Sequence, residues 1–426
     1  MMIYQKISMK EFLNKLKWRF LFFLSVLGPG IITAVADNDA GGVATYTVAA
    51  ATFGMASKFL TIPETFILAI TQEIGARIAM VTKKGLGDLI RERYGVGLSL
   101  LIFVLYFITN QGVVLQNVSG LKASFQLFNV NWRLFLVLTC LLLIFFVIFF
   151  DYKKLQRVFL IMILFYLSYI FSAILAKPNW VEAAKESFVW PTKVNVFDLT
   201  FWFSRIAVLG TTITAWGQFF VHSYIIDKKL DVRHLKYERL EVYLGAFLTN
   251  FFSWMMAVAV TYTLFVHGIK VTDGYTAALA IKPFVGETAF LFFALGLFAA
   301  SILGLTIVPL ATAYVFAEIF GYEGSLDASF SKGKLFYGFF IIQILIGLLV
   351  ALFPQTSLFK LTLYVDFLNG AMLPIIFYFL VKFSEDEEIM GKYVTSGLSR
   401  LLVRGSAVVI SILVVLTFFG KILKLV

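Results

Sequence analysis

This sequence contains little charge and almost no cysteine. Of its 426 residues, 14% are charged and 60% are hydrophobic, and 48 are phenylalanine. So low a charged fraction excludes an ordinary water-soluble globule and indicates a chain that crosses a membrane many times. The single cysteine, Cys140, lies in an apolar run. It therefore offers no disulfide, no metal cluster and no redox centre.

We expect no cleavable signal peptide, and the sequence shows no motif of a soluble enzyme. Residues 1–17 are polar and amphipathic, and the apolar run that follows continues as a spanning segment. No nucleotide-binding loop or haem signature is present, so we expect a chain that is not an enzyme and needs no cofactor. The net charge of +11 is spread over short loops. This placement fits contact with a lipid bilayer better than nucleic-acid binding, and no obligate protein partner is evident.

Apolar runs of about 20 residues, long enough to cross the hydrocarbon core, recur along the whole chain. We predict an all-α integral membrane protein of the cell membrane, with a single transmembrane domain over 1–426 and eleven spans. The predicted spans are 20–52 (broken), 57–81, 97–126, 131–150, 155–176, 198–227 (broken), 239–267, 286–319, 333–353, 358–383 and 401–423.

The distribution of Lys and Arg predicts the orientation. Every second connection is rich in basic residues, including 83–93, 153–157, 228–239 and 392–404, whereas the alternate connections hold less than half as many. Cytoplasmic loops carry the excess of Lys and Arg. We therefore expect a cytoplasmic N-terminus and an extracellular C-terminus.

The first span is interrupted by the sequence Asp-Asn-Asp-Ala-Gly-Gly over 37–42. A charge at membrane depth costs several kcal/mol, roughly, unless it faces a cavity, a partner or an ion. We expect the helix to break here and to free backbone carbonyls near Ala36 for a cation. Asp39 is favoured as the ligand and Asp37 as a helix cap or a residue of the access path. The alternative is that an aspartate merely caps the half-helix that begins near Gly42.

A second small and hydroxyl-rich stretch, 210–218, interrupts the sixth span. Interruptions at corresponding places in two halves are typical of transporters built from inverted repeats. The repeats would be 1–176 (helices 1–5) and 198–383 (helices 6–10), with 401–423 added as helix 11. The alternative is a channel or receptor with two kinked helices.

Further polar residues of the spans complete the candidate site. In the sixth span, Thr214 and Gln218 lie near one face, and the Ala215 carbonyl would be free at a break. In the tenth span, Asp366 and Asn369 are three residues apart and share a helix face. An Asp within a span is functional by default. Its alternative role is a structural pair with one of three basic residues that lie within spans: Arg77, Lys122 and Arg205.

The second and third spans carry polar residues of other kinds. Glu73 and Arg77 have the spacing of an ion pair on one helix, and we interpret them as structural or as part of an inner gate. The polar residues of the third span, Asn110, Gln111, Gln116 and Asn117, are all neutral. That span therefore holds no carboxylate or histidine to pass protons.

These residues resemble the natural resistance-associated macrophage protein (NRAMP) family of divalent-metal transporters over nearly the whole chain. Gly28-Pro29-Gly30 followed by 39–45 resembles the first-helix motif of the family. Gly210-Thr211-Thr212-Ile213 and Val221-His222-Ser223 frame the sixth-helix motif. The resemblance implies a LeuT-like fold of the APC superfamily: two inverted five-helix repeats with helices 1 and 6 broken.

Four departures from the family pattern change the expected chemistry. Gly42 replaces the family's Asn. The family's Met-Pro-His falls on 215–217, with a one-residue ambiguity that involves Thr214. The acidic pair that the family uses for protons falls on Val114 and Asn117, and Asp366 replaces a Gln. The lost thioether and the added carboxylate favour a harder ion, and this pattern is similar to the NRAMP-related magnesium transporter branch.

We therefore expect a transporter that imports Mg²⁺ or Mn²⁺ by alternating access, with weak or no proton coupling. Two alternatives remain. One is a proton-coupled Mn²⁺/Fe²⁺ importer of the same family. The other is a sodium-coupled amino-acid transporter of the same fold, although two acids at the first break would repel a substrate carboxylate.

Overall fold

The computed structural model describes residues 28–191, 194–271, 274–353 and 359–422. Helices account for the regular structure of these residues, and no strand occurs among them. In chain order the helices are α2 (Pro29–Ala36), α3 (Ala40–Phe53), α4 (Thr61–Thr82), α5 (Leu86–Leu127), α6 (Trp132–Phe149), α7 (Tyr152–Leu164), α8 (Leu167–Leu175), α9 (Trp180–Phe188), α10 (Leu199–Thr212), α11 (Ala215–Asp227), α12 (Leu235–Val260), α13 (Gly274–Phe320), α14 (Lys334–Leu352), α15 (Phe359–Ser384), α16 (Glu387–Met390) and α17 (Gly397–Ile422).

Nine helical segments of the described residues are long and apolar enough to cross a membrane. They correspond to nine of the predicted spans. The first and sixth spans are each divided into two shorter helices, α2–α3 and α10–α11. The chain is thus a multi-pass membrane protein, whereas the full number of eleven spans stays a prediction. Residues 20–27 of the first predicted span lie outside the described residues.

Two predicted boundaries differ from the structure because glycine allows a helix to change direction. α5 begins at Leu86 and bends at Gly95 (φ 80°), and α13 begins at Gly274 and bends at Gly286 (φ 80°). Only glycine adopts this φ at little cost. The expected spans 97–126 and 286–319 are therefore the parts that follow each bend. The connection between the predicted spans 155–176 and 198–227 contains the short helix α9.

Both breaks lie where the sequence predicted them. α2 starts with Pro29 in its first turn and ends at Ala36, and Asp39 then caps α3 by accepting a hydrogen bond from the Gly42 amide (2.9 Å). In the second break, Thr214 caps α11 by accepting from the Gly217 amide (3.0 Å). Side-chain caps satisfy amides that a helix start leaves unpaired. The breaks are therefore stable parts of the fold.

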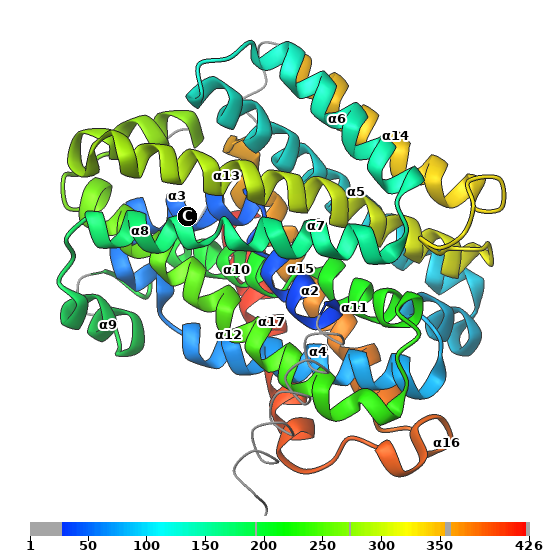
Figure 1. Ribbon diagram of the computed structural model, residues 1–426. Helices are drawn as coiled ribbons and strands as arrows, with labels where there is room; N and C mark the ends of the chain where they lie inside the picture. Colours follow the sequence, from blue (N-terminus) through cyan, green and yellow to red (C-terminus); the bar gives the residue numbers. More distant parts are fainter. Residues whose placement is uncertain (1–27, 192–193, 272–273, 354–358, 423–426) are drawn as a thin grey trace, which may run out of the picture.

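Figure 1 shows α2, α10, α11 and α15 in the middle of the molecule and α6 and α14 along one edge. Helix α13 packs along α5, α10 packs on α15, and α12 contacts both α2 and α4. The edge helices expose large apolar side chains, such as Leu138 and Leu141 on α6. An apolar surface of this kind is what a lipid bilayer covers. The interrupted helices therefore lie inside a shell of uninterrupted ones.

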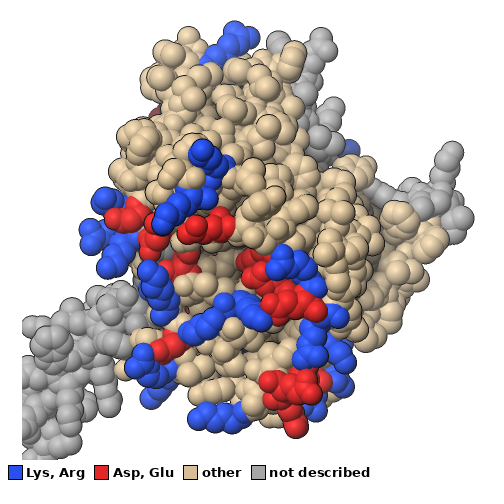
Figure 2. All heavy atoms as spheres, turned by 90° about the vertical axis from the view of Figure 1, so that its right-hand side faces the viewer, with Lys and Arg blue, Asp and Glu red and all other residues tan. Residues whose placement is uncertain are grey.

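Charged side chains gather on the face that Figure 2 presents, which is the right-hand side of Figure 1. We call this face the charged end. Its connections carry exposed ion pairs such as Lys84–Glu92 (2.7 Å) and Lys229–Asp327 (3.5 Å). A hydrogen bond from Arg233 lowers the pKa of Asp231 to about 2, so this pair keeps its charges at any ordinary pH. The charged end is formed by the connections that we predicted to be cytoplasmic.

Candidate metal site

The two breaks lie against each other. The Thr214 hydroxyl donates a hydrogen bond to Asp37 Oδ1 (2.6 Å), which joins the second break to the first. A Cβ at Gly42 would lie 2.9 Å from the Asp37 carbonyl oxygen, and one at Gly217 would lie 3.0 Å from Asp37 Oδ1. The glycines therefore allow the two breaks to approach this closely.

Asp39 has two kinds of partner. Its Oδ1 accepts from the Gly42 amide, and its Oδ2 accepts from Asn117 Nδ2 (2.7 Å). Asn117 Oδ1 in turn accepts from the Ala40 amide (3.0 Å). Asp39 is therefore the cap of α3, and the expectation that Asp37 fills that role is wrong. Each carboxylate oxygen has a second lone pair, so the capping role leaves Asp39 able to bind a cation as well.

Asp366 on α15 faces the first break. Thr45 on α3 donates to Asp366 Oδ2 (2.5 Å), and Gln116 Nε2 on α5 donates to Oδ1 (3.2 Å). Gln116 also reaches the break, because a Cβ at Gly41 would lie 2.4 Å from its Oε1. Gln116 thus links the first break to α15.

None of the three basic residues within spans pairs with Asp366. Arg205 forms an ion pair with Glu64, Arg77 forms one with Glu73 (3.0 Å), and Lys122 donates to the Ala351 carbonyl (3.1 Å). The structural-pair alternative for Asp366 is therefore excluded for these residues.

The three aspartates form a buried group of negative charges. Their exposed fractions are 1% for Asp37, 3% for Asp39 and 2% for Asp366. Asp39 lies close enough to repel both of the others electrostatically. Among the described residues, their hydrogen-bond partners are hydroxyls and amides, and no Lys or Arg pairs with them. Buried charges without a counterion are costly, so this group favours a cation.

The remaining predicted side chains are buried but stand apart from these hydrogen bonds. Gln218 and Asn369 are 0% and 1% exposed, and both polar atoms of each amide lack a hydrogen-bond partner. Asp37 Oδ2 also lacks one. Buried polar groups are nearly always satisfied, commonly by ordered water. The unpaired amides therefore leave hydrogen-bonding capacity for water near the breaks.

The two predicted backbone ligands differ. Ala36 ends α2, where carbonyls have no partner within the helix. Ala215 instead begins α11, so its carbonyl lies within the helical hydrogen-bond ladder. The expectation of a free carbonyl at Ala215 does not fit this geometry. The carbonyls freed at the second break belong to the last turn of α10, which ends at Thr212.

No group of three or more His, Cys, Asp or Glu side chains in the described parts of the chain is arranged to hold a metal ion. A cation at the breaks would therefore need neutral oxygens or water beside the carboxylates.

A family model described as natural resistance-associated macrophage protein-like matches residues 30–420. The chain belongs to the Nramp family.

Curated Nramp relatives are similar over most of their length. The divalent metal cation transporter MntH 1 of Pseudomonas aeruginosa is 24% identical over 396 residues, which cover 86% of this chain and 85% of the relative. The metal transporter nramp1 homolog of Dictyostelium discoideum is 24% identical over 421 residues, covering 94% and 76%. These Nramp relatives are transporters and not enzymes.

Solved structures confirm the predicted fold class. A crystal structure of the Eremococcus coleocola manganese transporter has a TM-score of 0.67 at 15% identity and covers 92% of this chain and 87% of that one. The structure of MhsT in complex with L-phenylalanine has a TM-score of 0.61 at 13% identity, covering 92% and 98%. Both have the LeuT-like fold, so the all-helical LeuT-like prediction holds. The repeat boundaries stay predictions.

Sequence reasoning missed three positioning residues of this Nramp chain. Thr45 and Gln116 hold Asp366, and Asn38 anchors the first break by donating to the Thr249 carbonyl (2.9 Å). The Tyr166 hydroxyl donates to the Asn38 carbonyl (3.0 Å) from the other side. An amide between two aspartates was a visible signal for Asn38. Thr45 carried none, because its partner lies 321 residues further along the chain.

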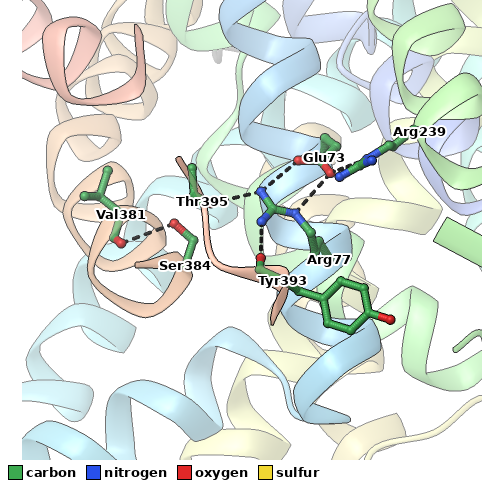
Figure 3. Close-up of polar contacts among 7 residues, drawn as sticks. All are labelled: Glu73, Arg77, Arg239, Val381, Ser384, Tyr393 and Thr395. Atoms are coloured by element: carbon green, nitrogen blue, oxygen red, sulfur yellow. Dashed lines mark hydrogen bonds and ion pairs between the residues drawn. The ribbon is translucent and has the colours of Figure 1, made fainter. Parts of the chain in front are cut away.

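The predicted pair of Glu73 and Arg77 exists and belongs to a larger set of contacts near the charged end. Figure 3 shows the Arg77 guanidinium between Glu73 on α4 and the segment that carries Tyr393 and Thr395. It donates to the Tyr393 carbonyl and to the Thr395 hydroxyl (2.9 Å), while Arg239 on α12 binds the same glutamate (2.7 Å). The pair therefore joins α4, α12 and the connection before α17.

Proposed function

We propose that this chain carries a divalent metal cation across the cell membrane by alternating access, with Mg²⁺ or Mn²⁺ as the substrate. The observation that carries the proposal is the buried group of Asp37, Asp39 and Asp366 without a basic partner among the described residues. A cation of charge +2 offsets most of that negative charge. The curated relatives are divalent metal transporters, and the solved relative is a manganese transporter.

The proposed ligands are all oxygens. Asp39 would be the primary anionic ligand and Asp366 the second, and the Ala36 carbonyl would bind from the end of α2. Thr214, Gln218 and Asn369 would act through water. None of the side chains hydrogen-bonded to the three aspartates contains sulfur. Oxygen sites suit Mg²⁺ and Mn²⁺, and Mg²⁺ in particular retains several of its waters.

The same contacts argue against strong proton coupling. Asn117 occupies the place where the resemblance predicts an acid, and its amide contacts both Asp39 and the first turn of α3. A carboxamide does not take up or release a proton near neutral pH. We propose that the membrane potential, not a proton gradient, drives import. A proton-coupled importer would instead acidify the vesicle interior during metal uptake.

The deciding experiment measures Mn²⁺ and Mg²⁺ uptake into proteoliposomes with a metal-sensitive dye. Asp39→Ala is expected to abolish uptake of both ions. Asp39→Asn keeps a good helix cap and removes only the charge, so its uptake is also expected to fall to background. Asp231→Asn, in an exposed connection, is the matched control and should transport normally. Uptake by Asp39→Ala at the wild-type rate would refute the site.

Ion competition tests the ligand chemistry separately. Isothermal titration of the purified protein with Mg²⁺, Mn²⁺, Ca²⁺ and Cd²⁺ is expected to show no strong preference for Cd²⁺, since a soft ion gains most from sulfur ligands. A site that binds Cd²⁺ far more tightly than Mn²⁺ contradicts the oxygen-only ligand set. Sodium-dependent binding of an amino acid with no metal binding would favour the alternative transporter.

A further inference from the structure

Two glutamates outside the metal site lie side by side at the start of α12. Glu238 and Glu241 are one helical turn apart, and both are 0% exposed. They pack against the beginning of α2, at its end remote from the break. Fully buried glutamates are rare unless they are paired, so each needs a physical explanation.

Glu241 supplies the cap that α2 lacks. The N-cap residue of α2 is Gly28, which has no side chain with which to cap the helix. Glu241 Oε1 instead accepts from the Gly28 amide and from the Ile31 amide (3.1 Å). A carboxylate at a helix N-terminus is stabilised by the amides and by the helix dipole. α2 is therefore held by a charge that lies more than 200 residues away in the sequence.

Glu238 receives no well-aligned hydrogen bond, although the Gly30 backbone amide lies beside it. Both of its oxygens lack a hydrogen-bond partner, and so does Glu241 Oε2. The Gly30 backbone is tightly packed here, because a Cβ at Gly30 would lie 3.2 Å from Glu238 Oε1. The carboxyl groups of Glu238 and Glu241 lie within hydrogen-bonding range of each other, so a proton between them would satisfy both.

The surrounding charges support one shared proton. Lys228, directly after α11, faces both glutamates. The Gln156 side chain of α7 lies beside Gly28, and the neighbouring Arg239 is engaged with Glu73. Two carboxylates and one ammonium leave a net charge of −1, and one proton makes the buried group neutral. Like charges this close do not both ionise readily.

We propose that Glu238 and Glu241 form a proton-binding site that shares a single proton and holds α2 in place. The ionised Glu241 then caps α2, and the protonated Glu238 donates to it. A second proton removes the charge from the cap and loosens α2. Because Lys228 follows α11, the same group connects both half-helices that meet at Asp37 and Thr214. Its effect on transport rests on the proposed function, whereas the proton site itself does not.

Infrared spectroscopy of the purified protein without metal tests for the shared proton. The wild type is expected to show a carbonyl band of a protonated carboxyl group that is lost in Glu238→Gln. A difference spectrum without such a band would overturn the proposal. Addition of Mn²⁺ to the Asp39→Ala variant distinguishes a metal from a proton. Loss of the band on adding Mn²⁺ would assign the pair to a metal and would also overturn it.

Hydrogen–deuterium exchange, again without metal, tests whether Glu241 stabilises α2. In Glu241→Gln, exchange in the peptide over 28–36 is expected to rise about tenfold, since a charge-assisted cap becomes a neutral one. Glu318→Gln is the matched control, because Glu318 is a partly buried glutamate that accepts from the Gly87 amide (2.9 Å) at the start of α5. It should loosen 86–90 and leave 28–36 unchanged.

A pH series separates the proton from a merely structural role. After correction for intrinsic exchange, acidification is expected to loosen 28–36 in the wild type but not in Glu241→Gln. A wild type whose α2 exchange is independent of pH would overturn the proposal. Metal is absent from these experiments, so a negative result would overturn the proton site without affecting the proposed metal site. A failure of metal uptake would likewise not affect the proton site.

Discussion

The three aspartates of the breaks differ in what their neighbours leave available. Asp37 accepts one hydrogen bond from a hydroxyl, and its other oxygen has no hydrogen-bond partner. Asp39 accepts a hydrogen bond from an amide on each of its two oxygens. Asp366 receives a hydroxyl and an amide. Hydroxyls rotate readily, while the backbone amide of Gly42 is fixed by α3. Asp39 is therefore the most rigidly held of the three, whereas Asp37 and Asp366 can each turn toward a cation when a hydroxyl rotates away.

We expect metal uptake to depend on the negative charge of Asp366 and not only on the shape of its side chain. Asp366→Asn keeps the size of the side chain and its ability to accept hydrogen bonds but removes one negative charge from a buried site. We expect Mg²⁺ uptake in proteoliposomes to fall on the order of tenfold or more, since a charge near a dication contributes several kcal/mol even at an effective dielectric constant of about 20. Mn²⁺ uptake measured in the same vesicles should fall less. Uptake of both ions at the wild-type rate contradicts a ligand role.

At the scale of elements, close backbone contact holds the second break against α15. A Cβ at Gly210 would lie 2.0 Å from the Asp366 carbonyl oxygen and 2.4 Å from the Gly370 nitrogen. These are backbone atoms, so they cannot rotate away. The glycine therefore determines how near α10 approaches the helix that carries Asp366.

Gly210→Ala is accordingly expected to destabilise the protein by about 1–3 kcal/mol or more through overpacking. Gly338→Ala is the control, because a Cβ at Gly338 on α14 meets nothing within 4 Å. That substitution should be neutral or stabilising by about 0.5–1 kcal/mol, since alanine favours a helix over glycine. Thermal unfolding in detergent compares the two, and equal melting temperatures would contradict the role of Gly210.

Contacts from Arg77 hold the connection before α17 in place. Arg77→Gln removes the ion pair with Glu73 and the donors to Tyr393 and Thr395. Glu73 keeps Arg239, so we expect a loss of only about 1–3 kcal/mol and a local effect. Limited proteolysis should show faster cleavage within 391–397. Lys84→Gln, which removes an exposed pair, should be cleaved at the wild-type rate.

The elements were more predictable than the contacts between them. Acids and paired glycines inside apolar runs have few interpretations in a membrane, so both breaks were located correctly. The prediction of a free carbonyl at Ala215 was wrong, because composition does not tell at which residue one helix ends and the next begins. Thr45 and Gln116 could not be predicted, since their roles depend on how α3 and α5 pack against α15. The same limit hid the cap that Glu241 provides for α2.

For the whole molecule, the distribution of charge bears on what drives transport. Charged side chains gather at the charged end (Figure 2), whereas the three buried aspartates lie where the first break meets α5, α11 and α15. A dication that crosses the full potential gains roughly 2.3 kcal/mol per charge per 100 mV. For a charge of +2, about 100 mV therefore suffices for a concentration ratio on the order of a thousand without any proton.

Uptake should therefore respond to voltage and move no protons. In proteoliposomes with a potassium diffusion potential, negative inside, Mn²⁺ uptake is expected to rise several-fold over uptake at zero potential. An internal pH dye should show no acidification that follows the metal. The proton that we propose for the Glu238–Glu241 pair stabilises α2 and is not a transported substrate. Acidification in step with Mn²⁺ entry, absent in Asp39→Ala vesicles, would establish proton coupling and refute a potential-driven importer.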